Sequence, residues 1–135
     1  MPYCTKQDLI DRFGEAEMIQ LTDRAATGEI DDAVLDQAIE DAGGEIDGYL
    51  ASGGYATPLS PVPRIVTAKA CDMARHALYD DHAAEQVRKR YEDAIRFLRA
   101  VADGTVKLGV SAPEPVGGNV AQMDGGRQVF GGGGF

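Results

Sequence analysis

The chain has 135 residues, of which 44% are apolar and 26% are charged. A chain of this length is expected to form one domain that buries about two-thirds of the surface of its unfolded state. It has no uninterrupted run of about eighteen apolar residues, so the sequence predicts no membrane-spanning helix. Its N-terminus lacks the charged-then-apolar pattern of a secretory signal, so we expect the protein to stay in the compartment that made it.

The formal net charge of −9 is unevenly distributed along the chain. Residues 1–52 contain 13 acidic and 3 basic side chains, whereas residues 53–135 contain 9 acidic and 10 basic ones. An acidic first half argues against a general nucleic-acid binder, whose binding face is basic. The asymmetry suits either a soluble acidic surface or head-to-tail contacts between an acidic face and a basic one.

Local signals predict two short helices at the start of the chain. Thr5 is a good N-cap and Asp8 stands at the capping-box position, so a helix is expected from there to Gly14. A second short helix is expected over residues 15–21, followed by a loop.

A longer helix is predicted from its cap at Asp31 to Ser52. Its apolar residues recur at helical spacing: Leu35, Ala38, Ile39, Ala42, Ile46, Tyr49 and Leu50. Gly43–Gly44 and Gly48 interrupt this pattern, and each costs up to about 1 kcal/mol relative to alanine. Either the helix bends there or a neighbouring helix crosses closely, and the sequence favours the crossing.

The stretch from Val62 to Asp81 contains the helix around which the other helices are organised. Pro63 stands where a helix tolerates proline, at the first helical position. Larger apolar residues and small ones recur at helical spacing: Val66, Ala70, Met73, Ala74, Ala77 and Leu78. Ile65, Ala68, Cys71 and Tyr79 extend the apolar character around much of the remaining surface. Small residues let neighbouring backbones approach closely, so we expect this helix to be packed on several sides. The sequence predicts an all-α fold, a small antiparallel bundle of about five helices.

The last helix is expected over residues 84–103 and ends before Gly104. Its outer face is basic: Arg88, Lys89, Arg90, Arg96 and Arg99. The simplest interpretation is a solvated helix face. Contact with the acidic half of another copy comes next, and contact with nucleic acid third, because no aromatic platform or recognition-helix context accompanies the basic residues.

The composition changes after Gly104, so we divide the chain into a helical domain, 1–104, and an extended C-terminal arm, 105–135. Alternating apolar residues predict a short strand over 105–110, and Gln128–Phe130 is strand-like as well. The arm is rich in glycine, which is costly to order. We therefore expect residues 111–135 to be mobile in the free subunit.

The sequence contains no pattern that points to catalysis or to a bound cofactor. Cys4 and Cys71 are isolated and fit reduced structural thiols better than a disulfide framework or a zinc site. His76 and His82 lie six residues apart, on different faces of a helix, and with Asp80–Asp81 they fit a polar turn. The glycine run near the C-terminus lacks the residues of a phosphate-binding loop. We expect no enzymatic activity, no cofactor and no metal.

The chain resembles a family of Mu-like prophage proteins that are encoded among the head and tail genes of tailed phages. The resemblance covers residues 1 to about 110, with a recognisable ending near the C-terminus, and rests on these segments: Met1–Leu9, Ile30–Asp32, Ala38–Ile39, Ile46–Leu50, Pro58–Leu59, Val62–Arg64, Cys71–Arg75, Leu78–Asp81, Val87–Ala94 and Gly126–Phe130. One departure is Gly53–Gly54–Tyr55, which stands where the family usually has a basic and aromatic segment.

That family is similar to head–tail connector proteins, the adaptor or head-completion proteins of long-tailed phages. The resemblance implies a structural virion protein at the head–tail junction that assembles in the bacterial host cytoplasm. It also implies a ring of this subunit, twelve-fold to match a portal, with the portal and a tail or tail-completion protein as partners. DNA would pass through the ring without specific binding, and no membrane is involved. The candidate interface residues are Arg88, Lys89, Arg96, Arg99, Val129, Phe130 and Phe135.

Two alternatives remain open at the level of sequence. The first is a small DNA-binding regulator that uses the basic face of the last helix. The second is another tail-assembly component such as a tail terminator, although a strand-rich fold is expected for that role.

Overall fold

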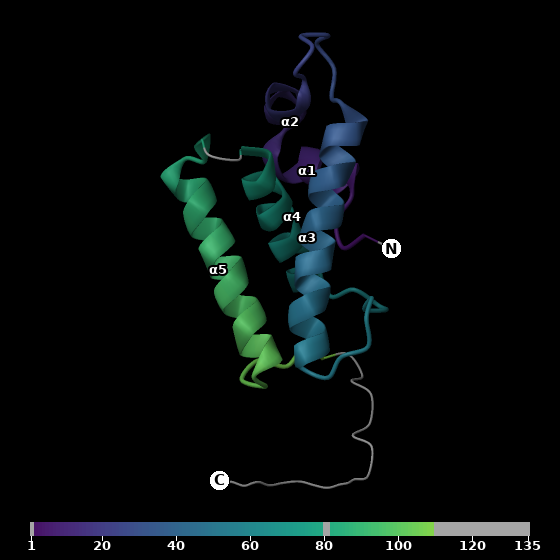
Figure 1. The fold of residues 1–135 in the computed structure, drawn as a ribbon, viewed down its shortest axis with the longest axis vertical. Coiled ribbons are helices and arrows are strands. Elements are labelled where there is room, and N and C mark those ends of the chain that lie inside the picture. The colour runs from purple at the N-terminus through teal and green to yellow at the C-terminus, as the bar shows by residue number, and fades with distance from the viewer. Residues whose placement is uncertain (1, 80–81, 110–135) are drawn as a thin grey trace, which may run out of the picture.

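The computed structural model describes residues 2–79 and 82–109 (Figure 1). Within these ranges the chain forms five α-helices and no β-strand, which confirms the predicted all-α bundle. The helices are α1 (Lys6–Phe13), α2 (Glu15–Thr22), α3 (Asp32–Ser52), α4 (Arg64–Tyr79) and α5 (Glu85–Ala102).

The predicted start signals are present at the first and third helices. The Thr5 hydroxyl accepts a hydrogen bond from the Asp8 amide at 3.1 Å, and the Asp8 carboxylate accepts one from the Thr5 amide at 3.0 Å. Asp31 caps α3 by accepting hydrogen bonds from two amides of its first turn. α4 begins one residue later than predicted, because Pro63 supplies a carbonyl that accepts from Val66 and is not itself helical. Each cap satisfies backbone groups that a helix end leaves unpaired.

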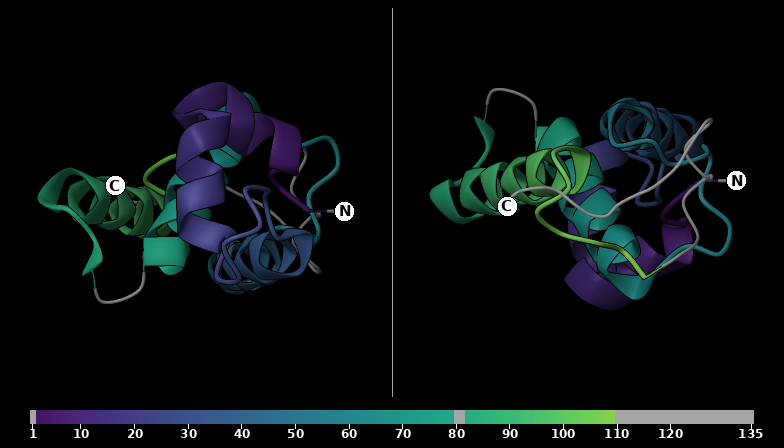
Figure 2. Two further views of the ribbon diagram at one scale, coloured as in Figure 1. Left: turned by 90° about the horizontal axis from the view of Figure 1, so that it is seen from above. Right: turned by 90° about the horizontal axis from the view of Figure 1, so that it is seen from below.

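Helix α4 lies at the centre of the bundle and contacts each of the other four helices. α3, α4 and α5 pack against one another, and the two short helices α1 and α2 cover α4 at one end of the molecule (Figures 1 and 2). The central face of α4 is buried and includes the small residues Ala70, Cys71 and Ala74. The neighbouring Cys71 thiol, followed by burial, raises the pKa of the Cys4 thiol. Both cysteines are buried and free.

A partly buried ion pair joins α2 to α4. The Arg75 guanidinium donates to the Glu17 carboxylate at 2.7 and 3.2 Å, and the Tyr79 hydroxyl donates to the same carboxylate at 3.2 Å. Arg75 also lies over the ring of Phe13, 4.2 Å from its centroid. One side chain of α4 therefore holds both short helices in place.

Tyr3 joins the N-terminal segment to α3 and to the connector before α4. Its hydroxyl donates to the Asp47 carboxylate and accepts a hydrogen bond from the Leu59 amide at 2.9 Å. The ring is almost fully buried, with 3% of its surface exposed. In the same connector the Thr57–Pro58 and Ser60–Pro61 peptide bonds are cis.

The strand predicted over residues 105–110 is wrong for its described part, 105–109, which has no regular structure. After α5 the chain turns at Gly104 (φ +88°), and the Val106 amide donates to the Ala100 carbonyl. The Leu108 amide donates to the Tyr55 hydroxyl. Val106 and Leu108 alternate because both pack against the bundle, not because they pair with another strand. The strand-like segment 128–130 and the mobility expected for 111–135 lie outside the described residues.

The predicted helix crossing at the glycines within α3 is also wrong. A Cβ atom added to Gly44 or Gly48 would meet no atom within 4 Å, and one on Gly43 would meet only the Tyr3 ring, at 3.9 Å. The close approach lies at the end of the helix instead. A Cβ atom on Gly53 would lie 3.0 Å from the Val101 carbonyl oxygen and 3.1 Å from the Ala102 Cα atom of α5.

This contrast gives a prediction about stability. Gly53→Ala should lower the free energy of unfolding by roughly 1–3 kcal/mol, because the added methyl group meets backbone atoms that cannot rotate away. Gly48→Ala is the matched control and should raise it by about 0.5–1 kcal/mol, because an exposed helical glycine loses more entropy on folding than alanine. Urea unfolding followed by circular dichroism measures both, and equal stabilities for the two variants would contradict the close contact.

Candidate interaction surface

The predicted basic residues all lie exposed on α5, but they do not form one free basic face. Arg88 pairs with Glu92 at 3.0 Å, and Arg96 pairs with Asp93 at 2.7 Å, both within the helix. Lys89 and Arg99 form no ion pair with any described residue. Exposed pairs of this kind contribute little to stability. Val129, Phe130 and Phe135, the other candidate interface residues, lie outside the described residues.

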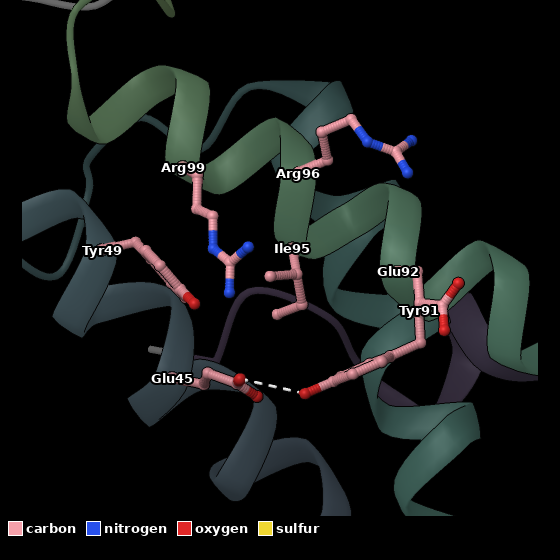
Figure 3. Close-up of a pocket in the computed structure, with 7 residues that line it drawn as sticks. All are labelled: Glu45, Tyr49, Tyr91, Glu92, Ile95, Arg96 and Arg99. Carbon is pink, nitrogen blue, oxygen red and sulfur yellow. Dashed lines mark hydrogen bonds between the residues drawn. The ribbon is translucent and has the colours of Figure 1, made fainter.

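A groove of about 510 Å³, which we call the α3–α5 groove, lies between α3 and α5 (Figure 3). Tyr91 of α5 donates a hydrogen bond to Glu45 of α3 at 3.1 Å, and its ring stacks on His76 with the centroids 4.1 Å apart. Burial and the nearby Glu45 carboxylate raise the pKa of Tyr91. Arg99 points into the groove, whereas Arg96 points away from it (Figure 3). The groove is thus bridged and partly filled by side chains of this chain.

A second pocket, which we call the cationic pocket, lies between α1, α4 and α5 and has a volume of about 360 Å³. Three cations from three helices line it: Arg12 of α1, Lys69 of α4 and Arg90 of α5. The other lining residues are Phe13, Asp72 and Asp93. Sequence analysis did not identify this pocket.

Asp72 is the half-buried carboxylate of the cationic pocket. Burial raises its pKa, and the nearby cations, Arg90 and Lys69 first among them, act in the opposite direction. The ammonium group of Lys69 lies 5.7 Å from the centroid of the Phe97 ring, within the range of a cation–π interaction. The pocket therefore combines three positive charges with two carboxylates and the Phe13 ring, and its excess of positive charge suits an anionic group on a folded partner.

The opposite charge gathers on α3, which carries six carboxylates and no basic residue. Asp36, Glu40 and Asp47 are spaced by four and seven residues, so they share one side of the helix. We call this side the acidic flank. It lines a groove of about 540 Å³ together with Pro2, Tyr3, Ile39, Gly43 and Gly44.

The acidic flank faces away from α5. Glu45, which bonds to Tyr91 of α5, lies on the other side of α3. Figures 1 and 2 show α5 at one side of the bundle and the N-terminal segment, which borders the acidic flank, at the other. The acidic flank and the cationic pocket therefore lie on different sides of the bundle.

The part of the chain that the structure describes contains no group of three or more histidine, cysteine or acidic side chains placed to hold a metal ion. His76, one of the two histidines noted in the sequence, is engaged in its stack on Tyr91. None of the described helices is long and apolar enough to cross a membrane.

Comparison with known proteins identifies the family. Residues 3–124 match the family described as Bacteriophage Mu, Gp36. The chain belongs to the bacteriophage Mu Gp36 family. It is 36% identical over 134 residues to Gene product J of Escherichia phage Mu, covering 96% of this chain and 94% of the relative. It is 38% identical over 109 residues to the Mu-like prophage FluMu protein gp36 of Haemophilus influenzae, covering 81% of this chain and 77% of the relative.

These matches confirm the resemblance to Mu-like prophage proteins inferred from the sequence. The family match includes all five helices and therefore both the cationic pocket and the acidic flank. It also covers residues 105–124, the first part of the C-terminal arm. The Gp36 family thus extends over the helical body and part of the segment that follows it.

The buried tyrosine beside the acidic flank predicts a pH dependence of stability. Burial, followed by the hydrogen bond to Asp47, raises the pKa of Tyr3 to about 12 from its usual 10.0. The folded state holds this proton more tightly than the unfolded state. The stabilisation is therefore complete below pH 10 and is lost as the pH rises toward 12, with a slope of up to about 1.4 kcal/mol per pH unit.

Tyr3→Phe should remove this part of the slope, although it also lowers stability at neutral pH because the Leu59 amide loses its acceptor. Urea unfolding of both proteins at stepped pH values measures the difference. An identical pH dependence above pH 10 would show that Tyr3 does not titrate as the structure requires.

Proposed function

We propose that this member of the Gp36 family is a structural subunit of the phage head–tail connector. In this proposal several copies form a closed ring, twelve-fold to match a portal, which joins the portal of the DNA-filled head to a tail or tail-completion protein. The protein acts at the head–tail junction of the virion after assembly in the bacterial host cytoplasm. It binds partners and has no catalytic role.

The observation that carries the proposal is the placement of charge on the helical body. A closed ring of more than two copies needs a head-to-tail interface, in which two different surfaces of each subunit meet. Such surfaces must be complementary and must lie on different sides of the subunit. The acidic flank of α3 and the cationic pocket at α1, α4 and α5 meet both conditions.

The C-terminal arm, 105–135, supplies the second part of the proposal. Ordering a glycine-rich segment costs conformational entropy. The segment therefore becomes ordered when contacts with a partner offset that cost. In a connector, an arm of this kind ties the subunit to the portal or to its neighbour. The hydrophobic residues Val129, Phe130 and Phe135 are its proposed contacts.

The DNA-binding alternative has weaker support. Arg88 and Arg96 each pair with an acidic residue of their own helix, so α5 presents mixed charges and not a continuous basic stripe. The protein as a whole carries a net charge of −9, which repels the phosphate backbone. An acidic protein of this kind lets DNA pass without holding it.

Removing the gene from the phage that encodes it tests the connector proposal. We expect DNA-filled heads and separate tails that do not join, because the ring between them is missing. Adding the purified full-length protein should restore tailed particles, counted by electron microscopy. Protein that lacks residues 111–135 should keep its helical circular-dichroism spectrum but restore few or none.

Normal numbers of tailed particles without the gene would contradict the connector function. If the shortened protein restores joining as well as the full-length protein, the arm is not the element that locks the subunit in place.

A further inference from the structure

We propose that the cationic pocket of one subunit receives the acidic flank of the next, so that these two surfaces form the head-to-tail contact between copies. This inference rests on the proposed ring for its biological setting. The partner it names is a second copy of this chain, and the contact is defined by Arg12, Lys69 and Arg90 on one side and by Asp36 and Glu40 on the other.

The cationic pocket has more positive charge than its own carboxylates neutralise. None of its three cations has an ion-pair partner within 4 Å among the described residues. Of its two carboxylates, Asp93 is already paired with Arg96, and Asp72 is half-buried. Unneutralised cations held beside the Phe13 and Phe97 rings favour an anionic side chain from outside the subunit.

The acidic flank has exposed carboxylates without ion-pair partners in the part of the chain that the structure describes, next to glycines of the same helix. Asp36 and Glu40 are exposed and form neither an ion pair nor a side-chain hydrogen bond with another described residue. Gly43 and Gly44 follow on the same groove, with no atom of this chain above Gly44 within 4 Å. The Tyr3 ring covers Gly43, but the open surface at Gly44 lets another helix approach closely.

The positions of the two surfaces decide how they can meet. The cationic pocket is lined in part by α5, and the acidic flank lies on the side of α3 opposite to Glu45, which bonds to Tyr91 of α5. One subunit therefore cannot bring its own two surfaces together. Two copies can, and each copy then keeps one unused surface for a third, which is the arrangement that a ring requires.

A phosphate group of DNA is the other anion to consider for the pocket. The carboxylates of Asp72 and Asp93 line the pocket and repel a closely spaced row of phosphates. A helix that presents two carboxylates one turn apart brings less negative charge into the pocket than a row of phosphates does. The second copy is therefore the better occupant.

Zero-length crosslinking tests the contact directly. Full-length protein labelled with ¹⁵N is mixed with unlabelled protein at increasing concentrations and treated with a carbodiimide, which joins a lysine amine to a carboxylate in direct contact. We expect light–heavy peptide pairs that link Lys69 to Asp36 or Glu40. Lys69→Arg is the matched control, because it keeps the charge and the association but cannot form the amide link. Absence of these light–heavy pairs at every concentration would overturn the proposal.

A charge exchange provides the second test. One variant carries Lys69→Glu with Arg90→Glu, and the other carries Asp36→Lys with Glu40→Lys. Each should self-associate at least about tenfold more weakly than the unmodified protein, because like charges then face each other. An equimolar mixture should recover association, since both of its alternating contacts pair opposite charges. Native mass spectrometry measures this, and circular dichroism checks that each variant is folded.

Two outcomes would overturn the proposed contact. One is that either variant, measured alone, self-associates as strongly as the unmodified protein, and the other is that the equimolar mixture does not recover association. Loss of salt-dependent duplex-DNA binding in the pocket variant, with self-association intact, would assign the pocket to nucleic acid instead. The head–tail joining assay separates this proposal from the connector function. If the protein is required for joining but its copies do not associate through these surfaces, the proposed contact is refuted and the connector function is not.

Discussion

The rest of the structure depends on α4, which contacts the other four helices and buries the small residues Ala70, Cys71 and Ala74. A helix with bulky residues at these positions could not accept neighbours on every side, because protein interiors are filled to the density of crystals. Close approach around α4 lets a chain of 135 residues bury a complete core. It also leaves the long helices α3 and α5 with outward faces that have no packing role.

The charges of the protein occupy those outward faces, and the packing around α4 fixes their positions. α3 and α5 contact each other as well as α4, so each keeps one flank directed away from the other. The acidic residues of α3 fall on one such flank, and the cations beside α5 gather where α1 and α4 complete a pocket. The separation of charge is therefore a property of the fold, although the charges themselves do little to stabilise it.

The sequence predicted the helices because their signals are local. Thr5 and Asp31 cap helices through residues two or three positions away, and the apolar stripes report burial directly. The helix crossing predicted at the glycines of α3 was wrong because a glycine at a helix crossing and a glycine that faces solvent look identical in the sequence. The cationic pocket could not be predicted, since Arg12, Lys69 and Arg90 come from three helices whose packing no local pattern specifies.

In the proposed contact between copies, assembly would depend on folding. The cations of the pocket approach one another only because α1, α4 and α5 are packed together, and Arg75 helps to hold α1 and α2 on α4 through Phe13 and Glu17. An unfolded or loosened subunit disperses these charges and offers no concentrated positive site. A subunit contact built on such a pocket therefore selects folded copies, whereas a contact built on one helix would form before the bundle is complete. In the proposed contact the positive side is distributed over three helices, so the completed fold would be the condition for joining the next subunit.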